Sequence, residues 1–165
     1  MNARLRAGML IAGVVALDRA TKLYVRAYVS PVDVYPVIPR FFNIVHTENP
    51  GAAFGMFSDS PTEWRGILLV GISAAVMAIL GVMLWRMAAA QSQVMSTGLA
   101  LVFGGALGNL VDRLFRGTVT DFLQLFFGSY EFPSFNAADS AISVGAVLLL
   151  IDLWRTRNQH HAEPT

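Results

Sequence analysis

The sequence predicts an all-α integral membrane protein built on four transmembrane helices. Of its 165 residues, 55% are hydrophobic and only 14% are charged, and the mean hydropathy is +0.53. An average soluble protein has about 25% charged residues, so this chain has too few to cover a water-exposed surface. Four apolar stretches alternate with polar connections, and the length suits a single integral membrane domain over 1–165.

The two middle spans are the clearest, because a helix needs about 20 apolar residues to cross roughly 30 Å of hydrocarbon. We expect one span over 64–86, since residues 66–85 carry no charge, and another over 94–113. The pattern Ser60-Pro61-Thr62-Glu63 predicts a capped start for the first of these two helices.

The first span is expected over 5–28, although its apolar run is short and continues through Asp18 and Lys22. These two charges are one helical turn apart, so they are placed to neutralise each other. A cleaved signal peptide is the alternative, because Arg4 and Arg6 precede the apolar run. No small-residue cleavage motif follows, which favours an uncleaved helix.

The last span, over 136–155, carries Asp139 near its start and Asp152 near its end. In the connection over 29–63, Pro31, Pro36 and Pro39 exclude a helix. Val32, Val34 and Val37, together with the apolar run 41–45, predict short strands. The connection over 114–135 mixes apolar and polar residues, and we expect it to lie in the membrane interface against the helices.

Charge and composition exclude several classes of function. A net charge of +1 without a basic cluster excludes a nucleic-acid partner, and the absence of cysteine excludes disulfides, thiolate metal sites and cysteine nucleophiles. No metal site is expected around the isolated His46, and an aspartate-only divalent site is the open alternative. Lysine and arginine divide almost evenly between the two sides, so charge alone does not set the orientation.

The end of the third span has polar residues at membrane depth. Gly104 and Gly108 form a face of small residues on which another helix can pack closely. Asn109 and Arg113 lie one turn apart on a neighbouring face. An amide one turn inside the membrane needs a partner, so these two residues are candidates for a functional site.

Simpler interpretations exist for the other polar residues. Asp112 with Arg116 is most simply an interfacial ion pair that ends the helix. Asn136 is a good N-cap for the last span, and Asp139 would then lie in its first turn. Asp121, flanked by apolar residues, is most simply a solvated turn residue.

A catalytic interpretation applies if Asp121 and Asp139 are brought together. Two carboxylates in one site do not both ionise easily, so one keeps a proton while the other loses it. Such a pair supplies the acid and the base needed to activate water against an amide. The turn that follows Glu48 is a second candidate, because the Asn49 amide and nearby backbone groups there can bind an extended ligand.

Five motifs in this order resemble the lipoprotein signal peptidase family, the bacterial signal peptidase II. They cover residues 18–140 of the chain, and they are Asp18-Arg19-Ala20-Thr21-Lys22, Asn49-Pro50-Gly51-Ala52-Ala53-Phe54, Gly104-Gly105-Ala106-Leu107-Gly108-Asn109-Leu110-Val111-Asp112-Arg113, Thr118-Val119-Thr120-Asp121-Phe122 and Phe135-Asn136-Ala137-Ala138-Asp139-Ser140. Any one of them is weak evidence, whereas five in order are strong evidence.

The resemblance implies an intramembrane aspartyl endopeptidase that removes signal peptides from prolipoproteins by cleaving before the diacylglyceryl-cysteine. It implies a catalytic dyad of Asp121 and Asp139. The substrate-binding and other polar positions that it implies are Asp18, Asn49, Gly51, Asn109, Arg113 and Asn136.

The resemblance also implies the setting in which the site works. It places the protein in the bacterial inner membrane, with both termini in the cytoplasm and the active site near the periplasmic face. It adds a small periplasmic β-rich cradle and an interfacial helix to the four spans. No cofactor is implied, and the expected partners are the lipid-modified substrate, membrane lipids and globomycin-type inhibitors, with the enzyme acting as a monomer.

Three residues depart from the family pattern without replacing the dyad. Arg19 stands where Gln is common, Thr120 stands where an apolar residue is usual, and Ala137 is smaller than usual. Two other classes remain open at this stage. A small ion-coupled transporter would also bury polar residues between helices, and a membrane scaffold would explain the glycines.

Overall fold

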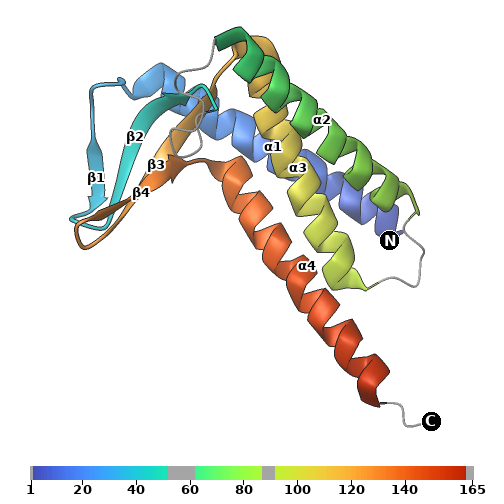
Figure 1. The fold of residues 1–165 in the computed structure, drawn as a ribbon. Coiled ribbons are helices and arrows are strands. Elements are labelled where there is room, and N and C mark those ends of the chain that lie inside the picture. Colours follow the sequence, from blue (N-terminus) through green and yellow to red (C-terminus); the bar gives the residue numbers. More distant parts are fainter. Residues whose placement is uncertain (1, 52–61, 87–91, 163–165) are drawn as a thin grey trace.

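The structure, a computed structural model, describes residues 2–51, 62–86 and 92–162. Its helices begin within two residues of the predicted starts, and the last one runs seven residues beyond its predicted end: α1 (Ala3–Tyr28), α2 (Thr62–Arg86), α3 (Gln93–Arg116) and α4 (Ala137–Ala162). Helix α3 lies in the middle and contacts each of the other three (Figure 1). Ser60 and Pro61, from the predicted start of the second span, lie outside the described residues.

Both connections contribute to one antiparallel sheet in the order β1-β2-β3-β4. Its strands are β1 (Tyr35–Ile38), β2 (Phe42–Asn49), β3 (Val119–Phe127) and β4 (Tyr130–Phe135). The connection over 114–135, predicted as an interfacial segment, instead forms the hairpin of β3 and β4. The described residues of the two connections include no interfacial helix, and residues 52–61 lie outside the description. The sheet confirms the strands predicted in the 29–63 connection and the expected β-rich element, and the hairpin extends it to four strands.

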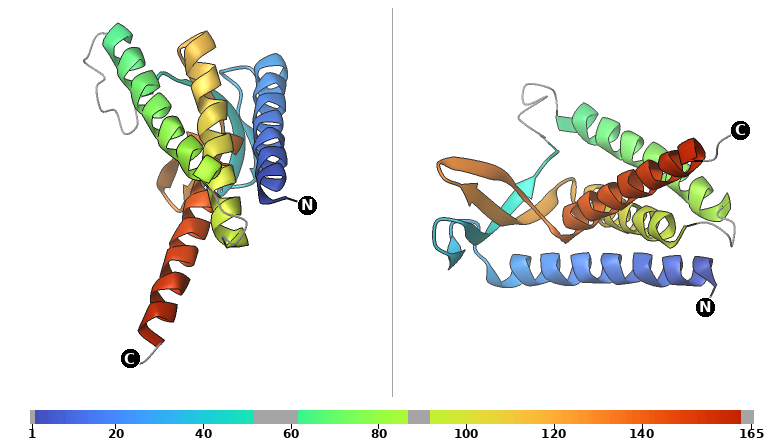
Figure 2. Two further views of the ribbon diagram at one scale, coloured as in Figure 1. Left: turned by 90° about the vertical axis from the view of Figure 1, so that its right-hand side faces the viewer. Right: turned by 90° about the horizontal axis from the view of Figure 1, so that it is seen from below.

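The sheet lies at the end of the bundle away from the start of α1 and the end of α4 (Figures 1 and 2). Buried Val25 and Val29 at the end of α1 pack with Phe122 of β3, and Ile44 of β2 joins this cluster. The strands are thereby fixed to the helices by apolar contact, as well as to each other by backbone hydrogen bonds.

Glycines let α3 approach its neighbours closely. A Cβ atom at Gly104 would lie 3.0 Å from Val14 of α1, and one at Gly108 would lie 2.6 Å from Asp18 Oδ2. On the side facing α4, a Cβ at Gly105 would collide with the Ala138 carbonyl. The predicted small-residue face of Gly104 and Gly108 is therefore confirmed, and α1 is the helix that packs on it.

Three of the described helices are long and apolar enough to cross a membrane: Gly66–Arg86, Gln93–Arg116 and Ala137–Arg157. Large apolar side chains project outward from α2 and α4, as expected for surfaces that face lipid. They include Ile67, Leu68, Ile72, Ile79, Val82, Val144, Val147, Leu150 and Leu153. The chain is thus a membrane protein with multiple candidate spans.

Candidate active site

Asn136 joins the two predicted catalytic carboxylates. Its side-chain Nδ2 donates to Asp121 Oδ1 at 2.7 Å, and its backbone N–H donates to Asp139 Oδ2 at 3.2 Å. Asn136 is fully buried, and it lies between the end of β4 and the start of α4. Two aspartates that are 18 positions apart in the sequence thus share one hydrogen-bonding residue.

The same asparagine also caps α4. Its Oδ1 accepts the backbone N–H of Asp139 at 3.0 Å, while the Asp139 carboxylate accepts the backbone N–H of Asn136. These reciprocal bonds form a capping box, which satisfies two backbone donors at the helix start. Capping uses the oxygen of the Asn136 amide and leaves its nitrogen free for Asp121. Asn136 therefore caps α4 as predicted, and this role is compatible with its predicted place in the candidate site.

Two further asparagines bind the remaining carboxylate oxygens. Asn49 Nδ2 donates to Asp121 Oδ2 at 3.0 Å, and Asn109 Nδ2 donates to Asp139 Oδ1 at 2.7 Å. The Asn49 side chain is itself oriented, because its Oδ1 accepts the Gly51 N–H at 2.8 Å. Each of the four carboxylate oxygens thus accepts a hydrogen bond from an asparagine. Ala52, Ala53 and Phe54 of the Asn49 motif lie outside the described residues.

Asp121 lies in strand β3 with 3% of its surface exposed, so its interpretation as a solvated turn residue is wrong. Burial raises the pKa of Asp121 to about 6, and the nearby charge of Asp139 acts in the same direction. Hydrogen bonds from Asn49 and Asn136 oppose this rise, since they favour the charged form. A carboxyl with this pKa can hold a proton close to neutral pH.

Arg113 of α3 lies near Asp121 and Asp139. Its charge interacts with those of Asp139 and Asp121, but it forms no ion pair with either within the described residues. Its Nε is buried, and no hydrogen-bond partner for it lies in the described ranges. The buried Nε of Arg113 is thus a donor for which the described residues supply no acceptor.

A buried ion-pair network supports the site from behind. Lys22 Nζ lies 2.8 Å from Asp18 Oδ2 and 2.8 Å from Asp112 Oδ2, and all three side chains are fully buried. The same ammonium donates to Asn109 Oδ1 at 2.9 Å, which leaves the amide nitrogen of Asn109 to bind Asp139. Asp18 accepts the backbone N–H of Ala138 at 3.1 Å, so it links α1 to the first turn of α4.

Asp112 is the centre of this network, and its predicted pairing with Arg116 is wrong. Its carboxylate contacts Arg19 at 2.7 Å and Arg26 at 2.9 Å, in addition to Lys22. The helical spacing of Asp112 and Arg116 was the misleading signal, because Asp112 points toward α1 instead. The predicted pairing of Asp18 with Lys22 is confirmed.

The predicted site residues did not include Lys22, Arg26 or Thr120. Lys22 gave a usable signal, because a lysine at membrane depth needs more than a single partner. Arg26 and Thr120 gave no such signal, since they contact each other across 94 positions of the sequence. The described residues contain no group of three or more His, Cys, Asp or Glu side chains placed to hold a metal ion.

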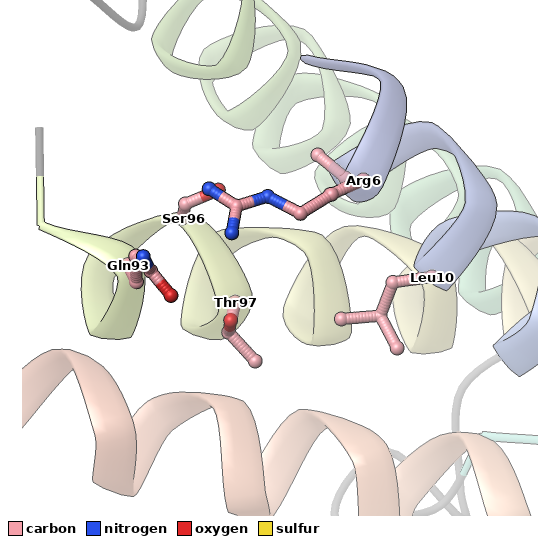
Figure 3. A pocket seen from close by; sticks show the side chains of 6 residues that line it. Arg6, Leu10, Gln93, Ser96 and Thr97 are labelled. Atoms are coloured by element: carbon pink, nitrogen blue, oxygen red, sulfur yellow. The ribbon is translucent and has the colours of Figure 1, made fainter. Parts of the chain in front are cut away.

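One cavity of about 460 Å³ leads from Asp139 along the aromatic face of the hairpin. It is lined by Leu125, Phe127, Phe132, Phe135, Asp139, Ser140, Ser143 and Val144. A smaller cavity of about 70 Å³ lies between the starts of α1 and α3, where Arg6 extends over Ser96 (Figure 3). That second cavity is at the far end of α3 from Asn109, so it is not part of the site.

The fold and the site define a class of protein. A membrane fold that brings two aspartates onto one buried residue, with an apolar cavity beside Asp139, is the arrangement expected of a membrane aspartic peptidase. The chain belongs to one family of that class, because the model of the signal peptidase II family matches residues 10–155.

Named relatives and solved structures agree with this assignment. A lipoprotein signal peptidase of Solibacter usitatus is 50% identical over 144 residues, which is 87% of each chain. One from Yersinia pseudotuberculosis is 42% identical over 139 residues, covering 84% of this chain and 80% of that protein. Two solved bacterial membrane enzymes share the fold. One has a TM-score of 0.82 and 29% identity over 97% of this chain and 94% of its own. The other has a TM-score of 0.78 and 32% identity, and the match covers 90% of this chain and 92% of its own.

Proposed function

We propose that Asp121 and Asp139 are the catalytic dyad with which this signal peptidase II cleaves signal peptides from prolipoproteins. The bridge through Asn136 is the observation that carries the assignment, since it holds both carboxylates in one place, and Asp139 lines the adjacent cavity. One copy of the chain supplies both aspartates, which suits an enzyme that acts as a monomer.

The two aspartates have different surroundings, which suggests their roles. The pKa of Asp121 is raised to about 6, so this carboxyl holds a proton more readily. Asp139 lies in the first turn of α4, near the positive end of the helix dipole, and its carboxylate accepts the backbone N–H of Asn136 and the side-chain amide of Asn109. We therefore assign Asp139 as the base and Asp121 as the acid.

Hydrolysis then proceeds with one water and one shared proton. Asp139 takes a proton from the water while the water oxygen bonds to the scissile carbonyl carbon. At the same time, Asp121 donates a hydrogen bond to the carbonyl oxygen. The C–N bond breaks as Asp121 transfers its proton to the leaving nitrogen. The dyad ends with the one proton it had at the start, now on Asp139, and transfer between the carboxyls restores the initial state.

The surrounding polar residues hold this geometry and the substrate. Asn49 and Asn109 keep the two carboxylates oriented, and Lys22 and Asp18 support them through Asn109 and the start of α4. Arg113, whose Nε is without a partner in the described ranges, donates to a substrate carbonyl.

The substrate is a prolipoprotein whose cysteine carries a diacylglyceryl group, and cleavage occurs just before that cysteine. The apolar cavity beside Asp139 gives lateral room for a lipid-bearing peptide. All four helices span the bacterial inner membrane, α1 included despite its charges, as one integral domain over 1–165. The termini are then cytoplasmic, the sheet and the dyad lie near the periplasmic face, and globomycin-type inhibitors bind at the dyad.

The test uses purified enzyme in detergent, a lipid-modified prolipoprotein and the gel shift that follows loss of the signal peptide. Asp121→Asn and Asp139→Asn should each abolish cleavage while leaving expression and membrane insertion intact. Asp152→Asn is the matched control, because it changes a carboxylate at the other end of α4 and should cleave normally. Near-normal cleavage by either dyad variant would refute the assignment. No cleavage by the folded wild type would favour a transporter or a scaffold.

A further inference from the structure

Strands β2 and β3 carry different residues on their two faces where they pair. Glu48 lies opposite Thr120, and Asn49 lies opposite Val119. Side chains alternate between faces along a strand, so Asn49 and Asp121 share one face while Glu48 and Thr120 share the other. The first face belongs to the dyad. The second faces α1, where Arg26 lies within hydrogen-bonding distance.

The register of this pairing shifts just before the site. Ile44 pairs with Leu123 and Thr47 pairs with Asp121, so β2 uses one residue more than β3 over this interval. Such a bulge re-aims the side chains that follow it, and a slip by one residue would turn Asp121 to the other face. Side-chain contacts beyond the bulge are therefore needed to fix the position of Asp121.

Thr120 makes those contacts. Its Oγ1 accepts a hydrogen bond from Arg26 Nε at 2.7 Å and donates one to Glu48 Oε1 at 2.8 Å. It is fully buried, so neither bond competes with water. One hydroxyl thus ties β3 to α1 and to β2, directly beside Asp121.

The two partners of Thr120 are themselves held in place. Arg26 also contacts Asp112 at 2.9 Å, and Thr118 donates to Glu48 Oε2 at 2.6 Å. His46, at the bulge, contacts Glu48 Oε1 at 3.1 Å. The hydroxyl of Thr120 therefore connects the buried ion-pair network of α1 to the strand pair beyond the bulge.

We propose that Thr120 is a positioning residue for catalysis: its hydroxyl, bonded to Arg26 and Glu48, holds Asp121 in the register that faces Asp139. The proposal rests on the proposed dyad. Thr120 itself points away from the dyad and does not touch the substrate. Its loss should therefore lower kcat and leave KM nearly unchanged, because substrate contacts stay in place while one carboxyl is misplaced.

The central experiment compares Thr120→Val with Thr120→Ser in steady-state cleavage of a lipid-modified prolipoprotein. Valine keeps the shape and removes both hydrogen bonds, and it should lower kcat by about tenfold to a hundredfold, the scale expected for a misplacement near 1 Å. KM should stay within about twofold. Serine keeps the hydroxyl and should restore most of the rate. Thr21→Val is the control and should leave kcat unchanged, since among the described residues that hydroxyl bonds only to carbonyls of its own helix.

A second variant guards against misfolding of Thr120→Val. Glu48→Ala changes a partly exposed side chain, so the fold should tolerate it, and it removes the acceptor for Thr120. We expect a several-fold lower kcat. In the double variant the two losses should be less than multiplicative, because both act through one hydrogen bond.

The outcomes separate this proposal from the dyad. Wild-type kcat in both Thr120→Val and Glu48→Ala, with Asp121→Asn inactive, would overturn the positioning role and leave the dyad standing. A serine variant as slow as the valine variant would also overturn it, because the hydroxyl would then be irrelevant. Full cleavage by Asp121→Asn would refute the dyad itself.

Discussion

Replacing Asp121 by asparagine should change how the stability of the protein depends on pH. Burial raises the pKa of Asp121 from 3.8 to about 6, so between these values the folded protein holds a proton that the unfolded chain has released. Folding stability therefore falls as pH rises through this interval, and the loss is complete above about pH 6. Asparagine has no such proton, so the variant lacks this part of the pH dependence.

The size of the effect follows from the shift. A rise of about 2 pKa units at about 1.4 kcal/mol per unit corresponds to about 3 kcal/mol of stability lost by the wild type between pH 4 and pH 7. For a chain of this size, that corresponds to about 6–12 °C in Tm. The variant also loses hydrogen bonds from Asn49 or Asn136, because one of its side-chain atoms is a donor. That cost of about 1 kcal/mol is the same at every pH, so it displaces the whole curve.

The assay is thermal unfolding of both proteins in one detergent, from pH 4 to pH 8. We expect the Tm of Asp121→Asn relative to that of the wild type to rise across the interval and level off above pH 6. Asp33→Asn is the control, because this carboxylate is exposed, and its difference from the wild type should stay flat. A difference for Asp121→Asn that is equally flat would refute the claim that burial makes this carboxyl hold its proton.

Two substitutions test how the helices are held together. Lys22→Met leaves Asp18 without a cation in the described ranges and should destabilise the fold by about 3–5 kcal/mol, measured as Tm and accompanied by loss of cleavage. Gly105→Ala places a methyl group against the Ala138 carbonyl and should cost about 1–3 kcal/mol by separating α3 from α4. Gly13→Ala is the control, because open space surrounds Gly13, and it should be neutral or slightly stabilising. Equal Tm losses in the two alanine variants would contradict the claim that Gly105 is needed for close packing.

Much of the fold was predictable because hydrophobicity acts locally along the sequence. The uncharged run within α2 needs no knowledge of the rest of the chain to be identified as a span. The hairpin of β3 and β4 was missed because its residues mix apolar and polar types without clear alternation. Its stability comes from pairing with β2, which is about 75 positions away, and from packing of Phe122 against α1. Neither contact leaves a local pattern in the sequence.

The residues of the candidate site could be named from the sequence, but their connections could not. Asp121 and Asp139 were identified because carboxylates near hydrocarbon need an explanation and because their motifs resemble a family. Spacing could not show that Asn136 would cap α4 with one end of its amide and bind Asp121 with the other. Spacing was misleading for Asp112. Arg116 lies one turn further along the same helix and was a plausible partner, but the structure pairs Asp112 with three cations of α1.

The charges of α1 explain why this helix is the least apolar of the four. Lys22 is fully buried, and its charge would be costly there without partners. Asp18 and Asp112 each place a carboxylate oxygen 2.8 Å from its Nζ and balance its charge, while Asn109 accepts a hydrogen bond from it. The Asn109 oxygen is used in this way, so its nitrogen must point to Asp139. The lysine that makes α1 a poor apolar span thus fixes the orientation of the Asn109 amide beside Asp139.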